Sequence, residues 1–147
     1  MAPSLPEWPA RTIAVLATLD DGPHAIPVSA PVRADDHTIL LGLHRSRDSL
    51  ARLRRRPQVA LLVLAEGNVA FTARGQARIA AEPMADAPEY AAVAIDVTEL
   101  DDHRHPAFTV EAGVDRAWID DTEREALGRR VEALRALPAA RHHGAVV

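Results

Sequence analysis

Residues 39–65 constrain the fold most, because they place a basic turn and a short helix between two apolar strands. They read ILLGL, then HRSRDSLARLRRRP, then QVALLVLA. The second apolar run, residues 58–65, is hydrophobic on both faces, which is typical of a strand that is covered on both sides. A chain built around this strand therefore needs a second covering surface in addition to its own core.

The segment between the two strands predicts a helix of about two or three turns. Ser46 or Asp48 can cap its first turn by accepting a hydrogen bond from a free backbone N–H, and Pro57 ends it. Leu50 and Leu53 are three residues apart, so both can face a core while the neighbouring arginines stay in water.

The start of this helix has the groups that hold a phosphate. Its first N–H groups carry a partial positive charge, and Ser46, Arg47, Ser49 and Arg52 add hydroxyls and guanidinium groups nearby. A second interpretation fits equally well, in which the helix is a solvated amphipathic segment whose arginines only keep the surface soluble.

Length and composition indicate one domain over residues 1–147, with an N-terminal arm at 1–10 and a flexible tail at 138–147. The chain has no cysteine, which excludes disulfides, thiolate nucleophiles and Cys-ligated metal sites. No leader pattern and no apolar run long enough to cross a bilayer is present. We therefore expect a soluble cytoplasmic protein that has no contact with a membrane.

The charge of the chain narrows the function further. A net charge of −4 argues against nucleic-acid binding, since only residues 45–56 are basic. All 17 basic residues are arginine. Without lysine, neither a Schiff base to pyridoxal phosphate nor a phosphate-loop lysine can form, which excludes two large enzyme classes.

The remaining pattern predicts a mainly β fold with short helices, in which antiparallel strands close into a barrel. Apolar alternation predicts strands at residues 11–20, 24–33, 38–43, 69–83 and 90–100, the last of them half-buried, and a final strand at 107–120 broken near Gly113. Pro27 and Pro31 fall in the second of these strands and each removes a hydrogen-bond donor, so this strand is expected at an edge, at a bulge or beside a ligand. Gly75 suggests a bulge or a close packing contact.

Residues 122–137 predict a C-terminal helix that ends before Pro138. Thr122 and Glu125 have the spacing of a capping box, in which each side chain bonds to the backbone of the other. An apolar stripe, which should face the core, consists of Leu127, Val131 and Leu134.

Other candidate sites give weak signals. His103 and His105 could be drawn as a metal site with the neighbouring aspartates, but a solvated loop explains them better, and we predict no metal. A Ser46–His44 pair could form a nucleophile and a base, without any surrounding motif that indicates hydrolysis.

Aromatic residues make up only 3% of the chain, so the two tryptophans stand out. A place in the core is the default expectation for both Trp8 and Trp118. Trp118 lies beside Arg116, however, and could instead cover a planar ligand.

The order of these features resembles the FMN-binding split β-barrel family of pyridoxamine 5′-phosphate oxidase-like proteins. The segments that carry the resemblance are IAVLATLDDGPHAIPVSAPV, ILLGLHRSRDSLARLRRRPQVALLVL and FTARGQARI, within residues 11–82. The resemblance implies a homodimer with two flavin sites at its interface, and the partner chain would then cover the outer face of residues 58–65. The basic C-terminal segment of the true oxidases is not evident, so we do not expect that particular activity.

The resemblance also implies where the cofactor binds. The phosphate of FMN would lie at the turn and helix start, and the isoalloxazine ring against the second and third predicted strands. The cofactor-binding residues expected on this basis are Pro27, Val28, Ser29, His44, Ser46, Arg47, Ser49, Arg52 and Leu53.

The function implied is a flavin-dependent oxidoreductase acting on a small molecule, in which the ring of FMN carries the electrons. One alternative is a deazaflavin-dependent reductase on the same fold. Another is a non-catalytic protein that holds flavin or haem, with His44 or His105 as a haem ligand. A fourth hypothesis is an arginine-patch interaction module without a cofactor.

Overall fold

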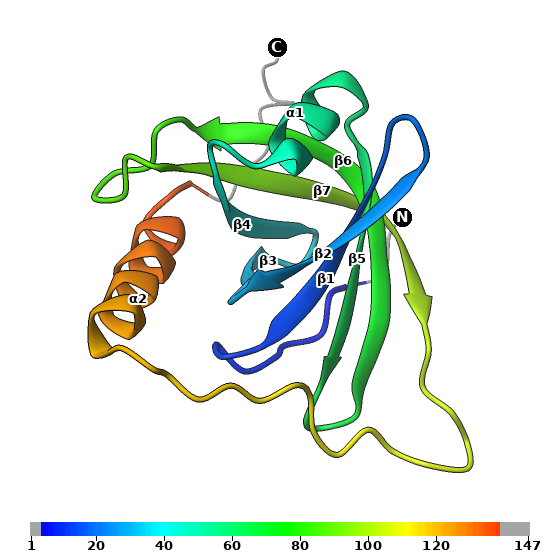
Figure 1. The fold of residues 1–147 in the computed structure, drawn as a ribbon. Coiled ribbons are helices and arrows are strands. Elements are labelled where there is room, and N and C mark those ends of the chain that lie inside the picture. Colours follow the sequence, from blue (N-terminus) through cyan, green and yellow to red (C-terminus); the bar gives the residue numbers. More distant parts are fainter. Residues whose placement is uncertain (1–3, 139–147) are drawn as a thin grey trace.

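The computed structural model describes residues 4–138, in which seven strands form one antiparallel sheet accompanied by two helices (Figure 1). The order of the strands in the sheet is β2-β1-β5-β6-β7-β4-β3. The elements are β1 Ile13–Leu19, β2 Pro23–Ser29, β3 Val32–Asp35, β4 Thr38–His44, α1 Asp48–Arg55, β5 Gln58–Ala65, β6 Val69–Ala81, β7 Tyr90–Asp102 and α2 Asp121–Arg135.

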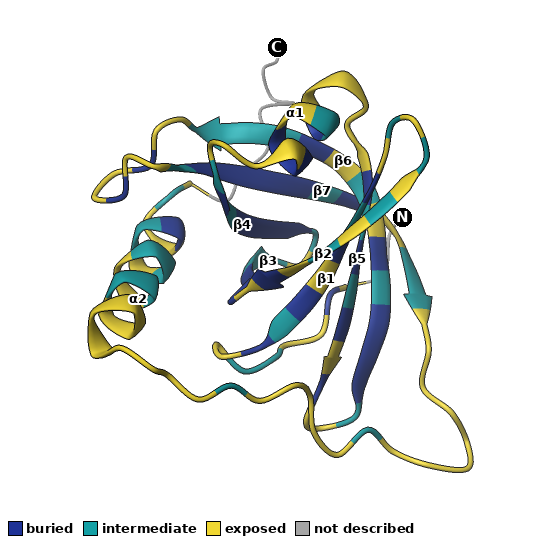
Figure 2. Cartoon of the chain, viewed as in Figure 1, coloured by how far each residue is buried: buried dark blue, intermediate teal, exposed yellow. Residues whose placement is uncertain are grey.

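The sheet curls around its main apolar core, and a second, smaller apolar cluster lies on its outer face. Figure 2 shows buried residues along β1, β5, β6 and β7. Strand β5 lies between β1 and β6 and supplies Leu61 and Val63, which are completely buried. Leu16 of β1, Ile39 of β4 and Ile95 of β7 pack into the same core. The expected class, a mainly β split barrel with short helices, is confirmed.

The prediction of a single strand over residues 24–33 is wrong, because the chain forms two strands there. Ala30 has a φ of 51°, in the left-handed region, and Pro31 follows it, so the chain turns between β2 and β3. Within the described chain, β2 pairs only with β1. The expectation that Pro27 marks an edge strand is therefore confirmed.

Strand β7 is buried on both faces over residues 91–95, so the prediction of a half-buried strand is wrong. The reason is a second apolar cluster on the outer face of the sheet, in which Ala92 and Ala94 are buried together with Met84 and Ala87 of the β6–β7 connection and Leu134 of α2. The apolar stripe of α2 is confirmed, and the helix ends just before Pro138 as expected. Its expected capping box is wrong, because Asp120 occupies the N-cap and its side chain accepts a hydrogen bond from the N–H of Thr122.

Residues 107–120 do not form the expected last strand. They run as an exposed, extended segment from β7 to α2 (Figure 1), held near the β5–β6 turn by two hydrogen bonds between Val110 and Asn68. Both edges of β6 are already paired with β5 and β7, so no ladder position is open to this segment there.

No helix among residues 4–138 has both the length and the apolar character needed to span a membrane. Of the predicted tail at 138–147, residues 139–147 lie outside the described part of the chain.

Gly75 lies where the register of β6 against β7 shifts, which confirms the expected bulge and close approach. A Cβ atom added at Gly75 would lie 2.1 Å from the backbone oxygen of Asp96. Since two backbone segments meet there, neither can move away without disturbing the ladder.

We predict that Gly75→Ala lowers the free energy of unfolding by about 1–3 kcal/mol, the usual cost of overpacking a well-packed site. Gly22→Ala is the matched control, because an added Cβ there meets no atom within 4 Å. Urea unfolding followed by circular dichroism measures both variants. Equal unfolding midpoints for Gly75→Ala and the wild type would contradict this account of the bulge.

Candidate functional site

A cavity of about 120 Å³ lies in the split of the barrel, between the free edge of β2 and the end of β4. The start of β7 and the inner face of α2 complete its wall. The lining residues are Ile26, Pro27, Val28, Ser29, Ala30, Gly42, Leu43, His44, Arg47, Tyr90, Leu127, Arg130, Val131 and Leu134.

Five of the nine residues expected to bind a cofactor line this cavity: Pro27, Val28, Ser29, His44 and Arg47. They come from β2, from the end of β4 and from the turn before α1, so the fold joins segments that are about 15 residues apart in sequence.

The other four expected residues lie outside the cavity wall. Ser46 does not line the cavity itself, but it is hydrogen bonded to His44, which does. Ser49 and Leu53 are 3% and 2% exposed, and Leu53 belongs to the main core. Arg52 lies near Asp20 of the β1–β2 hairpin, and its charge contributes to the lowered pKa of that carboxylate.

Helix α1 begins without a side-chain cap, so the expectation that Ser46 or Asp48 caps it is wrong. Arg47 occupies the N-cap, and its side chain cannot accept a hydrogen bond from the first N–H groups. Ser46 precedes the N-cap, and the hydrogen bond of its hydroxyl is to His44. The first turn of α1 thus presents N–H donors and a partial positive charge next to the cavity.

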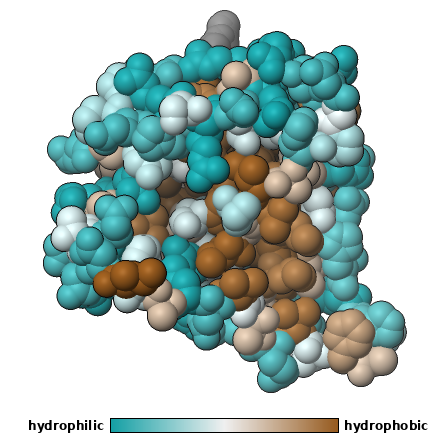
Figure 3. Space-filling model, in the orientation of Figure 1, coloured by the Kyte–Doolittle hydropathy of each residue, from teal (hydrophilic) through white to brown (hydrophobic). Residues whose placement is uncertain are grey.

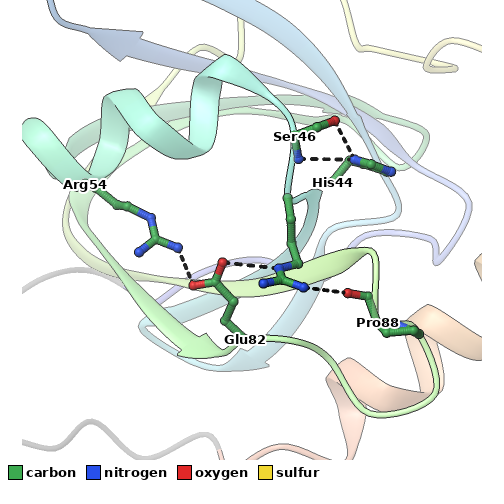
Figure 4. Close-up of polar contacts among 6 residues, drawn as sticks. His44, Ser46, Arg54, Glu82 and Pro88 are labelled. Carbon is green, nitrogen blue, oxygen red and sulfur yellow. Dashed lines mark hydrogen bonds and ion pairs between the residues drawn. The ribbon is translucent and has the colours of Figure 1, made fainter.

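Three of the six arginines at residues 45–56 are neutralised by carboxylates. Glu82 forms ion pairs with Arg54 and, at 3.4 Å, with Arg45, as Figure 4 shows for Arg54 and Glu82. The hydrogen bond from Arg54 is the main cause of the lowered pKa of Glu82, and Arg45 adds to it. Arg47 has no ion pair among the described residues, so a ligand can use its charge.

Arg55 binds Asp20 of the β1–β2 hairpin with two hydrogen bonds of 2.6 and 2.9 Å. This bond is the first cause of the lowered pKa of Asp20, with the charges of Arg55, Arg56 and Arg52 contributing further. The pair fixes the far end of α1 to the barrel and leaves its N-terminal end facing the cavity.

His44 and Ser46 form the pair considered from the sequence, with 2.8 Å between Nδ1 and Oγ (Figure 4). The backbone N–H of Ser46 also donates to Nδ1 at 3.2 Å, so this nitrogen is the acceptor and the neutral ring carries its proton on Nε2. No carboxylate among the described residues is bonded to His44. A nucleophile–base–acid triad is therefore not assembled here.

Sequence reasoning missed the residues that close the cavity from the other side, Tyr90 and the α2 side chains. Arg130 lies 4.1 Å from the centre of the Tyr90 ring, in a cation–π contact. It is three residues after Leu127 and four before Leu134, so helical spacing alone places it on the apolar face of α2. That position was the available signal for a functional arginine.

The histidines considered for a metal are engaged elsewhere. His103 Nε2 lies 2.7 Å from Thr72 Oγ1, and the ring of His105 stacks on Phe108. In the described part of the chain, no three His, Cys, Asp or Glu side chains come together as a metal site. Trp8 packs on Phe71 as expected of a core residue, whereas Trp118 is 39% exposed and its core placement is wrong.

Comparison with solved structures shows the same fold in the three proteins that follow. A protein from Mesorhizobium loti described as FAD-binding matches at a TM-score of 0.51 with 15% identity, over 62% of this chain and 84% of that chain. An F420 reductase matches at 0.52 with 14% identity, over 63% and 91%. HupZ of Group A Streptococcus matches at 0.52 with 16% identity, over 72% and 90%. These identities indicate a shared fold and no more.

No curated protein matches the chain in sequence. The family model described as pyridoxamine 5′-phosphate oxidase matches residues 5–133. This match spans the whole sheet and most of α2, including both walls of the cavity. The chain belongs to the pyridoxamine 5′-phosphate oxidase family.

Proposed function

We propose that the chain binds FMN at the split of the barrel and acts as a flavin-dependent oxidoreductase on a small molecule. The observation that carries the proposal is the position of Arg47. It is a cation without an ion pair among the described residues, at the uncapped start of α1, on the wall of the cavity between β2 and β4.

The phosphate of FMN fits the N-terminus of α1. The first N–H groups of the helix need an acceptor, and the partial positive charge at this end favours an anion. The guanidinium of Arg47 can add a charge-assisted hydrogen bond of about 1.5–3 kcal/mol. No side chain of the described residues forms a cap hydrogen bond at this end of the helix.

The isoalloxazine ring fits the side of the cavity that β2 forms. As an edge strand, β2 has backbone N–H and C=O groups with no ladder partner on its outer side, and these can bond to the polar edge of the ring. Ser29 and the Nε2–H of His44 add side-chain donors on the same wall. When bound, a flavin supplies hydride or electron transfer, and the protein orients it and sets its polarity.

The enclosed space is too small for a whole cofactor. Pockets that hold cofactor-sized molecules usually measure about 300–1,000 Å³, whereas this cavity measures about 120 Å³. Most of a bound flavin must therefore extend beyond the walls that one chain provides. A second chain can supply the missing cover, so we include a homodimer with cofactor sites at its interface in the proposal.

An apolar face of the sheet supports this homodimer. Figure 3 shows apolar side chains gathered over β1, β2 and β5. The exposed apolar residues of these strands include Val15 and Leu19 of β1 and Leu64 of β5, at 37%, 47% and 43% exposure. Val15 lies opposite the half-buried Leu62 in the ladder, so the patch is continuous across both strands. A continuous apolar patch of this kind usually marks an interface.

FMN should bind at one molecule per chain, as measured by the change in its visible absorption on titration. Arg47→Ala should weaken binding by about 1.5–3 kcal/mol, the value of a charge-assisted bond. Arg56→Ala removes the same charge from the other end of α1, which does not border the cavity, and should leave the affinity nearly unchanged.

Equal affinities for Arg47→Ala and the wild type would refute the phosphate position. If the wild-type protein does not bind FMN but binds F420, a deazaflavin, then F420 replaces FMN as the proposed cofactor. Arg52→Ala tests the sequence-based expectation separately, and its effect should be small because Arg52 does not line the cavity.

Sedimentation velocity should show a particle of two chains for the wild-type protein. Val15→Glu should shift it to the monomer, because an unpaired carboxylate buried in an apolar interface costs several kcal/mol. Ile119→Glu, an equivalent change at a fully exposed position outside the patch, is the control. A monomeric wild type, or a dimer that survives Val15→Glu, would contradict an interface on this face.

A further inference from the structure

A second cavity, of about 320 Å³, lies beside the first, between α2 and the extended segment that precedes it. Figure 1 shows this segment leading into α2. The two cavities share three lining residues, Ala30, Leu127 and Val131. Its volume lies at the lower end of the range of about 300–1,000 Å³ that suits small organic ligands.

Four arginines line the second cavity, and three of them have a carboxylate partner. Arg11 pairs with Glu66, Arg124 with Asp121 at 3.3 Å, and Arg135 with Glu132 at 3.1 Å. The fourth, Arg116, has no ion pair within residues 4–138. Its charge is the one in this cavity that no carboxylate balances.

Arg116 is half-buried and held in a fixed position. One terminal nitrogen donates to Ser29 Oγ at 3.2 Å and the other to the backbone oxygen of Arg11 at 3.0 Å. Guanidinium has five N–H donors, so several remain for a ligand. Burial lowers the pKa of Arg116, which indicates that its charge has lost hydration without gaining an anion nearby.

The surroundings of Arg116 suit a flat apolar body. The guanidinium carbon lies 5.4 Å from the centre of the Trp118 ring, and Val114, Leu127 and Val131 complete an apolar wall. An anionic group bound by Arg116 would therefore place the rest of its molecule against the indole. Ser29, the hydrogen-bond partner of Arg116, is on the wall of the first cavity.

We propose that the second cavity binds a small aromatic or apolar organic anion through Arg116 and Trp118, directly beside the flavin position. That this molecule is the substrate rests on the flavin function proposed above; its binding does not. The anionic group is a carboxylate or a phosphate ester, since both match the guanidinium fork.

Isothermal titration calorimetry on the wild-type protein tests whether the second cavity binds such an anion. Three probes share the naphthalene ring: 2-naphthoate, 2-naphthyl phosphate and the neutral 2-naphthamide. At least one anion should bind about tenfold or more tightly than the amide, as expected of a charge-assisted contact. Arg116→Gln should remove this preference. Arg129→Gln, an exposed arginine on α2 outside the cavity, should keep it.

Three results would overturn the proposal: no binding of either anion, equal binding of anion and amide, or an unchanged preference in Arg116→Gln. The proposal would also be overturned if Arg47→Ala lost the preference for anion over amide while Arg116→Gln kept it. The anion would then occupy the first cavity. The probe comparison uses wild-type protein only, so it holds even if Arg116→Gln fails to fold.

The same samples are titrated with FMN to separate the two proposals. Uptake of FMN without any preference for the anions refutes the second site and leaves the flavin function standing. A preference for the anions without uptake of FMN, or of F420, supports the second site and refutes the flavin function.

Discussion

The free edge of β2 is the constraint on which the rest of the structure depends. Pro27 has no N–H to donate, and the chain leaves the strand through Ala30, in a left-handed conformation, and Pro31. In the described chain β2 therefore pairs with β1 alone, and it faces β4 without a ladder between them. The barrel stays split, and the split becomes a cavity that α2 covers and the start of α1 borders.

Local pattern was enough to predict elements whose bounds are decided within one segment. Residues 58–65 form β5 with the expected bounds. The apolar stripe of α2 faces the core as expected, and its residue Leu134 is buried. The errors came where a distant segment decides. Ala92 and Ala94 are buried because the β6–β7 connection and Leu134 of α2 cluster with them. Residues 107–120 join no ladder at β6 because both edges of that strand are already paired.

The site was predicted in part for the same reason. Pro27 and Arg47 carry a local signal, namely a proline in a strand and an arginine at a helix start, and both line the cavity. Ser29 lines it as well, but only the family resemblance pointed to it. Tyr90 and Arg130 come from elements more than 40 residues away along the chain, and only the packing of α2 brings them there. Ser49 and Leu53 share the helix with Arg47, but they lie on its core side.

The distribution of ion pairs explains how an acidic chain can attract an anion at one place. Ten arginines of residues 4–138 form ion pairs with carboxylates. Three of those without one, Arg47, Arg116 and Arg130, line the two adjoining cavities. Since carboxylates neutralise most of the surrounding surface, the positive potential stays local. It suits a small anion that enters a cavity, and it is too confined for a polyanion that needs a basic face.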